Sequence, residues 1–172
     1  EPNHVDDEGN PEFWPYLRDP DTLARAWAIP GTPGLMHRPG GLEKADITGN
    51  ISYDPANHER MVELRAAKVA GIAKDIPDLV VEGDVDDADL LVLGWGSTWG
   101  AIDGAVNRAR NGGLKVASAH LTHLNPFPSN LGDVVKRYPR VIIPEMNLGQ
   151  LSLLIRGQFL VDATSISKVR GE

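Results

Sequence analysis

The sequence DLLVL at residues 89–93 decides the fold, because its four consecutive aliphatic side chains end directly at Gly94. A short, continuous apolar run is typical of a parallel strand that is covered on both faces of its sheet. Two similar runs follow, LKVASA at residues 114–119 and RVIIP at residues 140–144. Together these runs predict three parallel strands.

Apolar residues at helical spacing fill the interval after each predicted strand. Strands and helices that alternate in this way imply right-handed crossovers and helices on both faces of the sheet. The sequence therefore predicts an α/β fold with an open, mostly parallel sheet. The three helical patterns consist of Ile102, Ala105, Val106 and Ala109, then Leu131, Val134, Val135 and Tyr138, then Leu148, Leu151, Ile155 and Phe159.

A further helix is predicted to begin at Asp54-Pro55, because aspartate caps free amides and proline fits the first turn. Pro77 is expected to stop it. A short strand at residues 79–81 and a solvated acidic loop at residues 82–87 should follow. The apolar side of this helix is predicted to consist of Val62, Ala66, Val69, Ala73 and Ile76.

The first 53 residues differ in composition from the rest of the chain. Seven of the 13 prolines lie within the first 50 residues, which favours extended backbone and turns over helices. Large apolar side chains are nevertheless frequent here, so we expect an ordered arm that packs on its own domain or on a neighbour. One short helix is expected at residues 21–28. The predicted organisation is an extended proline-rich connecting arm at 1–53 and an α/β domain at 54–172.

Composition excludes several classes of protein. The formal net charge is −7 and the pI is about 5.2, which argues against general binding to nucleic acid or to an anionic membrane. The absence of cysteine excludes disulfides and cysteine-ligated clusters or zinc within this chain. No apolar run reaches the roughly 18 residues of a membrane span, and the polar, acidic start predicts no signal peptide. We therefore expect a cytoplasmic protein.

The turn Gly94–Gly100 (GWGSTWG) follows a predicted strand and precedes a helix, as a dinucleotide-binding turn does. Its spacing is one residue too long, Trp95 and Trp99 are bulky, and the next strand leads to His120 rather than to an acidic residue. The preferred interpretation is a tight turn with Ser97 or Thr98 as the N-cap. The alternative is a phosphate or other anion site formed by Gly96, Ser97 and Thr98.

Three other groups of polar residues remain as candidates. His120 and His123 could ligate a metal with Glu145 as third donor, but the preferred interpretation is a proline-rigidified loop that packs on a partner or caps the sheet edge. Glu145 could act as a general base, but a lone carboxylate more often accepts hydrogen bonds from loop amides, and Asn147 is expected to cap the fourth helix. The loop at 37–44 (HRPGGLEK) is interpreted as an interface, with an anion contact as the alternative.

Several motifs, read in order, resemble the C-terminal part of the alpha subunit of 2-oxoacid:ferredoxin oxidoreductases, and most closely the 2-oxoglutarate branch of actinobacteria. The resemblance runs from about residue 12 to the end. Met36 departs from it, because an acidic residue is expected there. The motifs lie at residues 30–35 (PGTPGL), 40–43 (GGLE), 48–50 (TGN), 89–100 (DLLVLGWGSTWG), 123–128 (HLNPFP) and 145–151 (EMNLGQL).

The resemblance implies a domain similar to the transketolase C-terminal domain, with a structural and subunit-contact role. It implies that the intact complex uses thiamine diphosphate and an iron–sulfur cluster, neither of them bound by this chain alone. The implied reaction makes acyl-CoA, CO₂ and reduced ferredoxin from 2-oxoglutarate. The implied partners are the thiamine-pyrimidine domain of the same subunit, the beta subunit and, through the complex, ferredoxin. No catalytic residue is carried over to this sequence.

Two other interpretations of the same residues remain open. The chain could be a free-standing nucleotide- or anion-binding module that uses the turn Gly94–Gly100, or an interaction domain without a ligand. All three interpretations share the predicted α/β fold.

Overall fold

The computed structural model describes residues 1–38 and 40–170, and these fall into two compact units, Glu1–Ile72 and Ala73–Glu172. The sequence placed the boundary earlier, at residue 53. The difference is helix α1 (Pro55–Gly71), which groups with the arm in the first unit. The division at residue 53 stays a prediction about the intact protein.

The arm is irregular, as its prolines predict, apart from a small hairpin. In the hairpin β1 (His4–Val5) pairs antiparallel with β2 (Pro11–Glu12). The predicted helix at residues 21–28 is wrong. The side chain of Asp19 accepts hydrogen bonds from the amides of Asp21 and Thr22, at 3.1 and 2.7 Å. This turn does not continue as a helix, because Leu23 has φ +56°, which lies outside the right-handed helical region.

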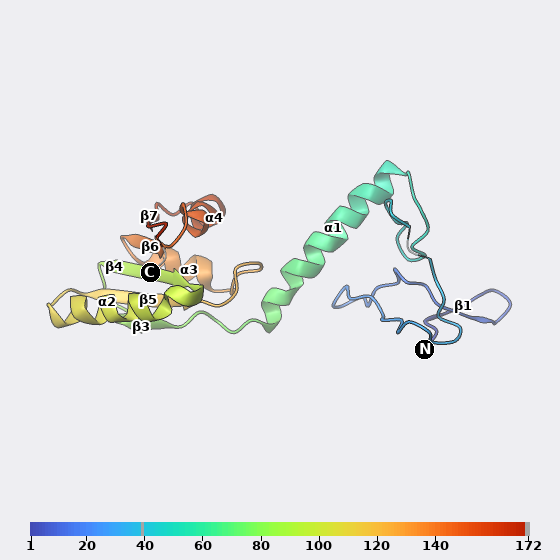
Figure 1. Ribbon diagram of the computed structural model, residues 1–172, viewed down its shortest axis with the longest axis horizontal. Coiled ribbons are helices and arrows are strands. Elements are labelled where there is room, and N and C mark those ends of the chain that lie inside the picture. The colour runs from blue at the N-terminus through green and yellow to red at the C-terminus, as the bar shows by residue number, and fades with distance from the viewer. Residues whose placement is uncertain (39, 171–172) are drawn as a thin grey trace. The chain divides into compact units, whose positions relative to one another are not determined.

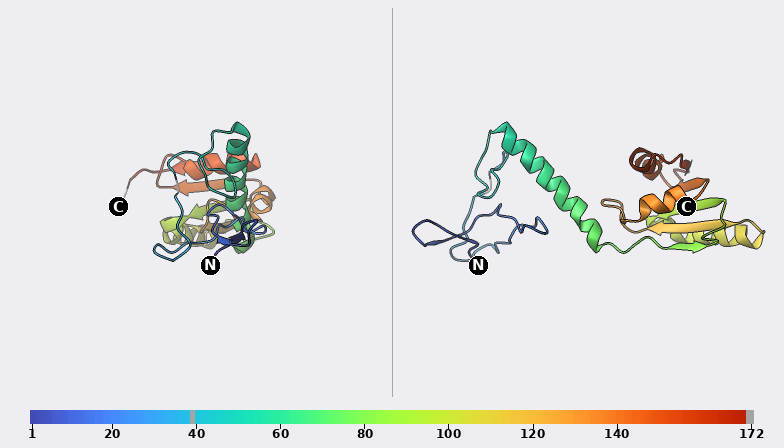
Figure 2. Two further views of the ribbon diagram at one scale, coloured as in Figure 1. Left: turned by 90° about the vertical axis from the view of Figure 1, so that its right-hand side faces the viewer. Right: turned by 180° about the vertical axis from the view of Figure 1, so that it is seen from behind.

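Helix α1 begins where the sequence predicts, because the Asp54 carboxylate accepts the amide hydrogen of Ala56 at 3.0 Å. A single 3-10 turn, η1 (Ile72–Asp75), extends the helix toward Pro77. Figure 2 shows α1 as one unbroken helix. The predicted apolar side is largely exposed, with Val62 at 45% and Val69 at 37%. The helix is confirmed, but within its unit this side is not covered.

The arm contacts α1 through charged and polar side chains instead. Arg60 Nε donates to Asp46 Oδ2 at 2.6 Å, and His58 Nδ1 lies 2.5 Å from Glu43 Oε2. The side-chain amide of Asn57 donates to the carbonyl oxygen of Lys44 and accepts from the amide of Asp46. These contacts couple the arm to the first turns of α1.

The contact between Glu43 and His58 predicts a pH dependence of stability. The hydrogen bond with His58, assisted by the Lys44 amide and by Arg65, lowers the pKa of Glu43 below its ordinary value of 4.5. A carboxyl group whose pKa is lowered by folding stabilises the fold above its unfolded pKa, and this contribution is lost as the pH falls through the folded pKa. We expect Glu43→Gln to lower the free energy of unfolding at pH 7. This loss should shrink as the pH falls below 4.5, because the Glu43 carboxyl group is then protonated in the original chain as well.

Urea unfolding of the chain and of Glu43→Gln at a series of pH values measures this effect. Glu63→Gln, on the exposed surface of α1, is the matched control and should show no such pH dependence. An energy difference between the chain and Glu43→Gln that stays constant through this pH range would contradict the assignment.

The second unit is built on a five-stranded sheet in the order β3-β5-β4-β6-β7. The three strands predicted from apolar runs are confirmed as β4, β5 and β6, with β4 parallel to both neighbours. The predicted strand at 79–81 lies two residues later and pairs antiparallel with β5. One strand, β7, was not predicted and lies parallel to β6. The strands are β3 (Val81–Gly83), β4 (Leu90–Trp95), β5 (Val116–Leu121), β6 (Val141–Glu145) and β7 (Thr164–Ser167).

Helices lie on both faces of the sheet, as the sequence predicts (Figure 1). Leu91 and Leu93 of β4 are fully buried in the core on one face, which contains α3 and α4. Val92 points to the other face and packs with Ile102 and Val106 of α2. The helices are α2 (Trp99–Asn111), α3 (Leu131–Arg137) and α4 (Gln150–Phe159).

The order of the strands explains why the two faces are unequally covered. The chain moves from β4 to β5 in one direction across the sheet, and from β5 to β6 and on to β7 in the other. Right-handed crossovers therefore place α2 on one face and both α3 and α4 on the opposite face. Helix α2 packs on β4 and β5, and among the described residues of the second unit no other helix lies over the β6–β7 half of this face. Among the described residues, no helix is long and apolar enough to cross a membrane.

Candidate functional site

Strands β4 and β6 are neighbours, but the helices that follow them lie on opposite faces of the sheet. Open α/β sheets bind ligands outside the carboxyl ends of strands at such a switch point. Two segments meet this criterion here, the turn after β4 and residues 145–147 after β6. The candidate residues at the two ends are therefore brought to one edge of the sheet.

The turn after β4 is tight, and its glycines have distinct roles. Gly96 has φ +60° and begins the 3-10 turn η2 (Gly96–Thr98). Gly94 allows close packing, since a Cβ atom there would lie 2.5 Å from Ile102 Cδ1 and 2.9 Å from His120 Nδ1. The Thr98 hydroxyl donates to the carbonyl oxygen of Trp95 at 2.7 Å. The prediction that a hydroxyl caps α2 is wrong, because the side chain at the N-cap position bonds backward to the turn.

His120 supports this turn through one nitrogen of its ring. Its Nε2 atom lies 2.9 Å from the carbonyl oxygen of Gly96, and a carbonyl can only accept, so Nε2 carries the hydrogen. Its Nδ1 atom is buried and has no hydrogen-bond partner among the described residues. The imidazole therefore links β5 to the turn after β4.

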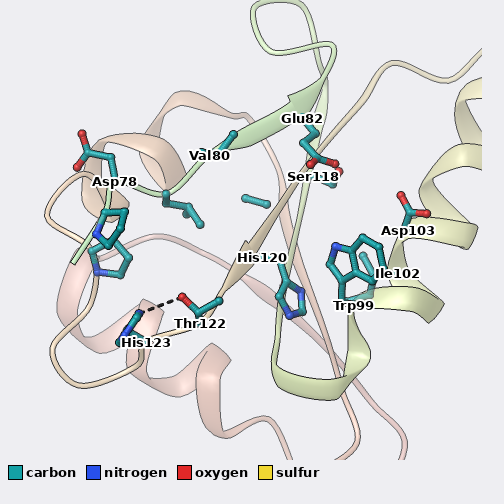
Figure 3. A pocket seen from close by; sticks show the side chains of 14 residues that line it. Asp78, Val80, Glu82, Trp99, Ile102, Asp103, Ser118, His120, Thr122 and His123 are labelled. Carbon is teal, nitrogen blue, oxygen red and sulfur yellow. Dashed lines mark hydrogen bonds between the residues drawn. The ribbon is translucent and has the colours of Figure 1, made fainter.

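A pocket of about 270 Å³ lies beside His120 at the carboxyl end of β5 (Figure 3). Thr122 and His123 line it, and the Thr122 hydroxyl is 2.9 Å from His123 Nδ1. Figure 3 shows the side chain of Thr122 between the two imidazoles. Within residues 1–38 and 40–170, no three His, Asp or Glu side chains gather in a way that could hold a metal ion. The pair His120 and His123 thus lacks the third ligand that a metal would need.

Glu145 acts as an acceptor for amides, which confirms the structural interpretation of this residue. Its side chain is 3% exposed and accepts hydrogen bonds from the amides of Leu151 at 2.9 Å and Ser152 at 3.1 Å. Both amides belong to the first turn of α4, where the helix dipole favours a negative charge. These bonds hold both carboxylate oxygens against α4, and Glu145 does not gather with His120 and His123 into a group that could hold a metal ion.

Asn147 closes the turn before α4. Its Oδ1 atom accepts from the amides of Gly149 and Gln150, at 2.7 and 3.0 Å. The helix itself begins at Gln150, with Gly149 at the N-cap position and φ +90°. Asn147 therefore satisfies the amides at the helix start, as predicted, although it lies two residues before the N-cap position.

The loop at 37–44 belongs to the first unit, and Pro39 lies outside the described residues. His37 Nδ1 is 2.9 Å from the carbonyl oxygen of Leu35, and Lys44 Nζ donates to the carbonyl oxygen of Leu42. Both polar groups thus contact the backbone of their own loop. The interface interpretation of this loop stays a prediction.

One concave surface of the second unit was not predicted from the sequence. It is an apolar groove of about 760 Å³ between α2 and strands β6 and β7, which we call the α2–β6 groove. At the carboxyl ends of the strands, the lining of the groove includes Ser97, Thr98, Glu145 and Lys168. The sequence gives only an indirect signal for this groove. The groove exists because α2 covers only part of its face of the sheet, and the sequence does not show which part stays uncovered.

Comparison with known proteins gives consistent results for this chain. The family model for pyruvate:ferredoxin oxidoreductase core domain II matches residues 88–170. The 2-oxoglutarate oxidoreductase subunit KorA of Mycobacterium tuberculosis is 58% identical over 159 residues, which are 92% of this chain and 24% of that protein. Subunit alpha of 2-oxoacid:ferredoxin oxidoreductase 1 from Aeropyrum pernix is 35% identical over 66% of this chain and 19% of its own length.

A solved structure agrees with these matches. The 2-oxoglutarate:ferredoxin oxidoreductase from Magnetococcus marinus, with 2-oxoglutarate, coenzyme A and succinyl-CoA bound, has a TM-score of 0.79 and 33% identity. The match covers 89% of this chain and 27% of the solved chain. The chain thus spans about a quarter of the length of these relatives. It belongs to the family of 2-oxoacid:ferredoxin oxidoreductase alpha subunits, in which residues 88–170 correspond to core domain II.

Proposed function

We propose that this chain is the C-terminal structural and subunit-contact domain of a thiamine diphosphate-dependent 2-oxoglutarate:ferredoxin oxidoreductase. The observation that supports this most strongly is the 58% identity to a 2-oxoglutarate oxidoreductase subunit over 92% of the chain. The proposed reaction of the whole enzyme converts 2-oxoglutarate and coenzyme A to an acyl-CoA, CO₂ and reduced ferredoxin.

The residues of this chain do not fit the cofactors that such an enzyme uses. The sequence has no cysteine for an iron–sulfur cluster. The described residues contain no group of three acidic or imidazole ligands that could hold the divalent ion of a diphosphate site. The polar groups at the switch point, Glu145 and His120, are used to hold α4 and the turn after β4. These observations support the proposed architectural role of this chain.

The proposed partners follow from that role. They are the thiamine-pyrimidine domain of the same subunit, the beta subunit and, through the complex, ferredoxin. Relatives named as subunits of oxidoreductases support a multi-subunit assembly. We place this assembly in the cytoplasm, without nucleic-acid or membrane partners.

Affinity purification of the gene product that contains this chain, from its own host, tests the proposal. We expect a second subunit to co-purify, and the complex to reduce a viologen dye only when 2-oxoglutarate and coenzyme A are both present. The 172-residue chain alone should show no such activity. A product that purifies without a partner, or a complex that does not turn over any 2-oxoacid, would overturn the proposal.

An anion site at Gly96, Ser97 and Thr98 is the second proposal, favoured by the position of this turn at the switch point. Isothermal titration of the 172-residue chain with NAD, FAD, coenzyme A, thiamine diphosphate and inorganic phosphate decides it. The variant Gly96→Val should disturb the turn, because position 96 has a φ of +60°, which disfavours a β-branched residue. Saturable heat for the original chain that disappears in this variant would support an anion-binding module. No heat with any of these compounds would remove it and leave the structural role.

A further inference from the structure

We propose that the α2–β6 groove is the seat of one amphipathic α-helix from the part of the alpha subunit that lies outside this chain. This inference rests on the proposed function, because it takes the chain to be one domain of a longer subunit. It adds which face makes the contact, and with what kind of element.

The groove is an apolar surface that the second unit leaves open. Its floor includes Val92, Ile142 and Pro144 from the sheet, and its walls include Ala105 of α2 and Ile166 of β7. Ile166 is 50% exposed even though it belongs to a parallel strand. Parallel sheets are normally covered on both faces, and a contiguous apolar surface of this kind marks an interaction site.

The geometry of the groove fits a helix better than a compact ligand. One side is α2, whose 13 residues extend about 20 Å at the rise of an α-helix. The lining residues run from Leu90 and Leu114, near the amino edge of the sheet, to Thr98 and Met146 at the carboxyl edge. Among the described residues of the second unit, the opposite face of the same sheet carries two helices and this face carries one. A second helix beside α2 would complete the layer.

The charged side chains that line the groove indicate which charge its occupant should carry. Glu145 and Lys168 are the charged residues of the lining. Both oxygens of Glu145 accept amides of α4, whereas no carboxylate of the described residues pairs with Lys168. An occupant that matches this surface presents aliphatic side chains along the floor and an acidic side chain at the carboxyl edge, close to Lys168.

The lengths of the relatives indicate where the helix comes from. This chain covers 24% of the KorA subunit and 27% of the chain in the solved oxidoreductase, so about three quarters of such a polypeptide lies outside it. A helix in the same polypeptide is tethered, and its effective concentration at the groove is far above that of a separate partner. The groove would then be covered as the subunit folds.

Site-specific photo-crosslinking in the intact complex tests the inference. The photoreactive residue p-benzoylphenylalanine is placed at Ala105, which is exposed and lines the groove, and in a separate variant at Asn107. Asn107 is the matched control, since it is exposed on the same helix but does not line the groove. After irradiation, mass spectrometry identifies the crosslinked peptides.

We expect position 105 to crosslink to a helical segment of the same alpha subunit outside residues 1–172, and position 107 to give at least tenfold less of that product. As a second measurement, Lys168→Glu should reduce the crosslink from position 105 by like-charge repulsion, and Lys168→Arg should preserve it. Crosslinks to the beta subunit, to residues 1–172 of any copy, or to no protein would overturn the inference. If the complex assembles and is active in those cases, the proposed function is unaffected.

Discussion

Replacing Leu93 with alanine is expected to lower the free energy of unfolding of the second unit by about 2–5 kcal/mol, which is the usual cost of a large-to-small change in a core. Leu93 is 0% exposed and lies on central strand β4, in the core that α3 and α4 cover. The loss combines the transfer free energy of the deleted methyl groups with the cavity that the surrounding side chains cannot fill.

Urea unfolding followed by tryptophan fluorescence measures this loss. Trp14 and Trp27 lie in the first unit, so both are first replaced with phenylalanine, and the signal then comes from Trp95 and Trp99. Leu153→Ala is the matched control, because Leu153 is 68% exposed on α4 and its truncation should change stability by less than about 0.5 kcal/mol. Equal losses for the two substitutions would show that the assigned core is wrong.

Replacing Glu145 with alanine is expected to destabilise the second unit by about 2–6 kcal/mol. The substitution leaves the buried amides of Leu151 and Ser152 without acceptors, and an unsatisfied buried donor costs about 1–3 kcal/mol. Glu145→Gln keeps one acceptor oxygen but loses the charge and adds a donor, so about half of the loss should remain.

The same fluorescence measurement, supplemented by amide hydrogen exchange, distinguishes this role from simple packing. Exchange should accelerate most at the first turn of α4, because its amides lose their acceptors. Leu148→Ala is the control in the same connection, since Leu148 is 85% exposed. If Glu145→Gln retained full stability, neither the charge nor the second acceptor oxygen would contribute, and this result would contradict the role assigned to Glu145.

The sequence predicted the sheet well because its central strands have a strong local signal. Residues 89–93, 114–119 and 140–144 form continuous apolar runs, and each lies within two residues of the strand observed. The edge strands have a weaker signal, because fewer of their side chains are buried. Strand β7 is exposed along its whole length. Its sequence, TSIS at residues 164–167, has a single apolar residue, so no apolar run or alternation could identify it as a strand.

The departures at the candidate site have a different cause, because they depend on contacts between distant residues. Local rules make Ser97 or Thr98 a good helix cap, yet the Thr98 hydroxyl bonds back to Trp95 in a turn that His120 also holds. The α2–β6 groove depends on the direction of each crossover, which apolar periodicity does not reveal. The acceptor role of Glu145 was predictable, since a carboxylate between a strand and a helix start meets unpaired amides.

The side chain of Arg110 has a consequence for the behaviour of the protein at high concentration. Its guanidinium group donates to the carbonyl oxygens of Val116 and Glu82 and to the Ser118 hydroxyl, and so ties the three-residue strand β3 to β5. Without that tie, the outer edge of β5 would present unpaired backbone groups on which another molecule can add a strand. The strand that this cation holds at the rim of the sheet has only three residues, and so short an edge offers few backbone groups for edge-to-edge pairing.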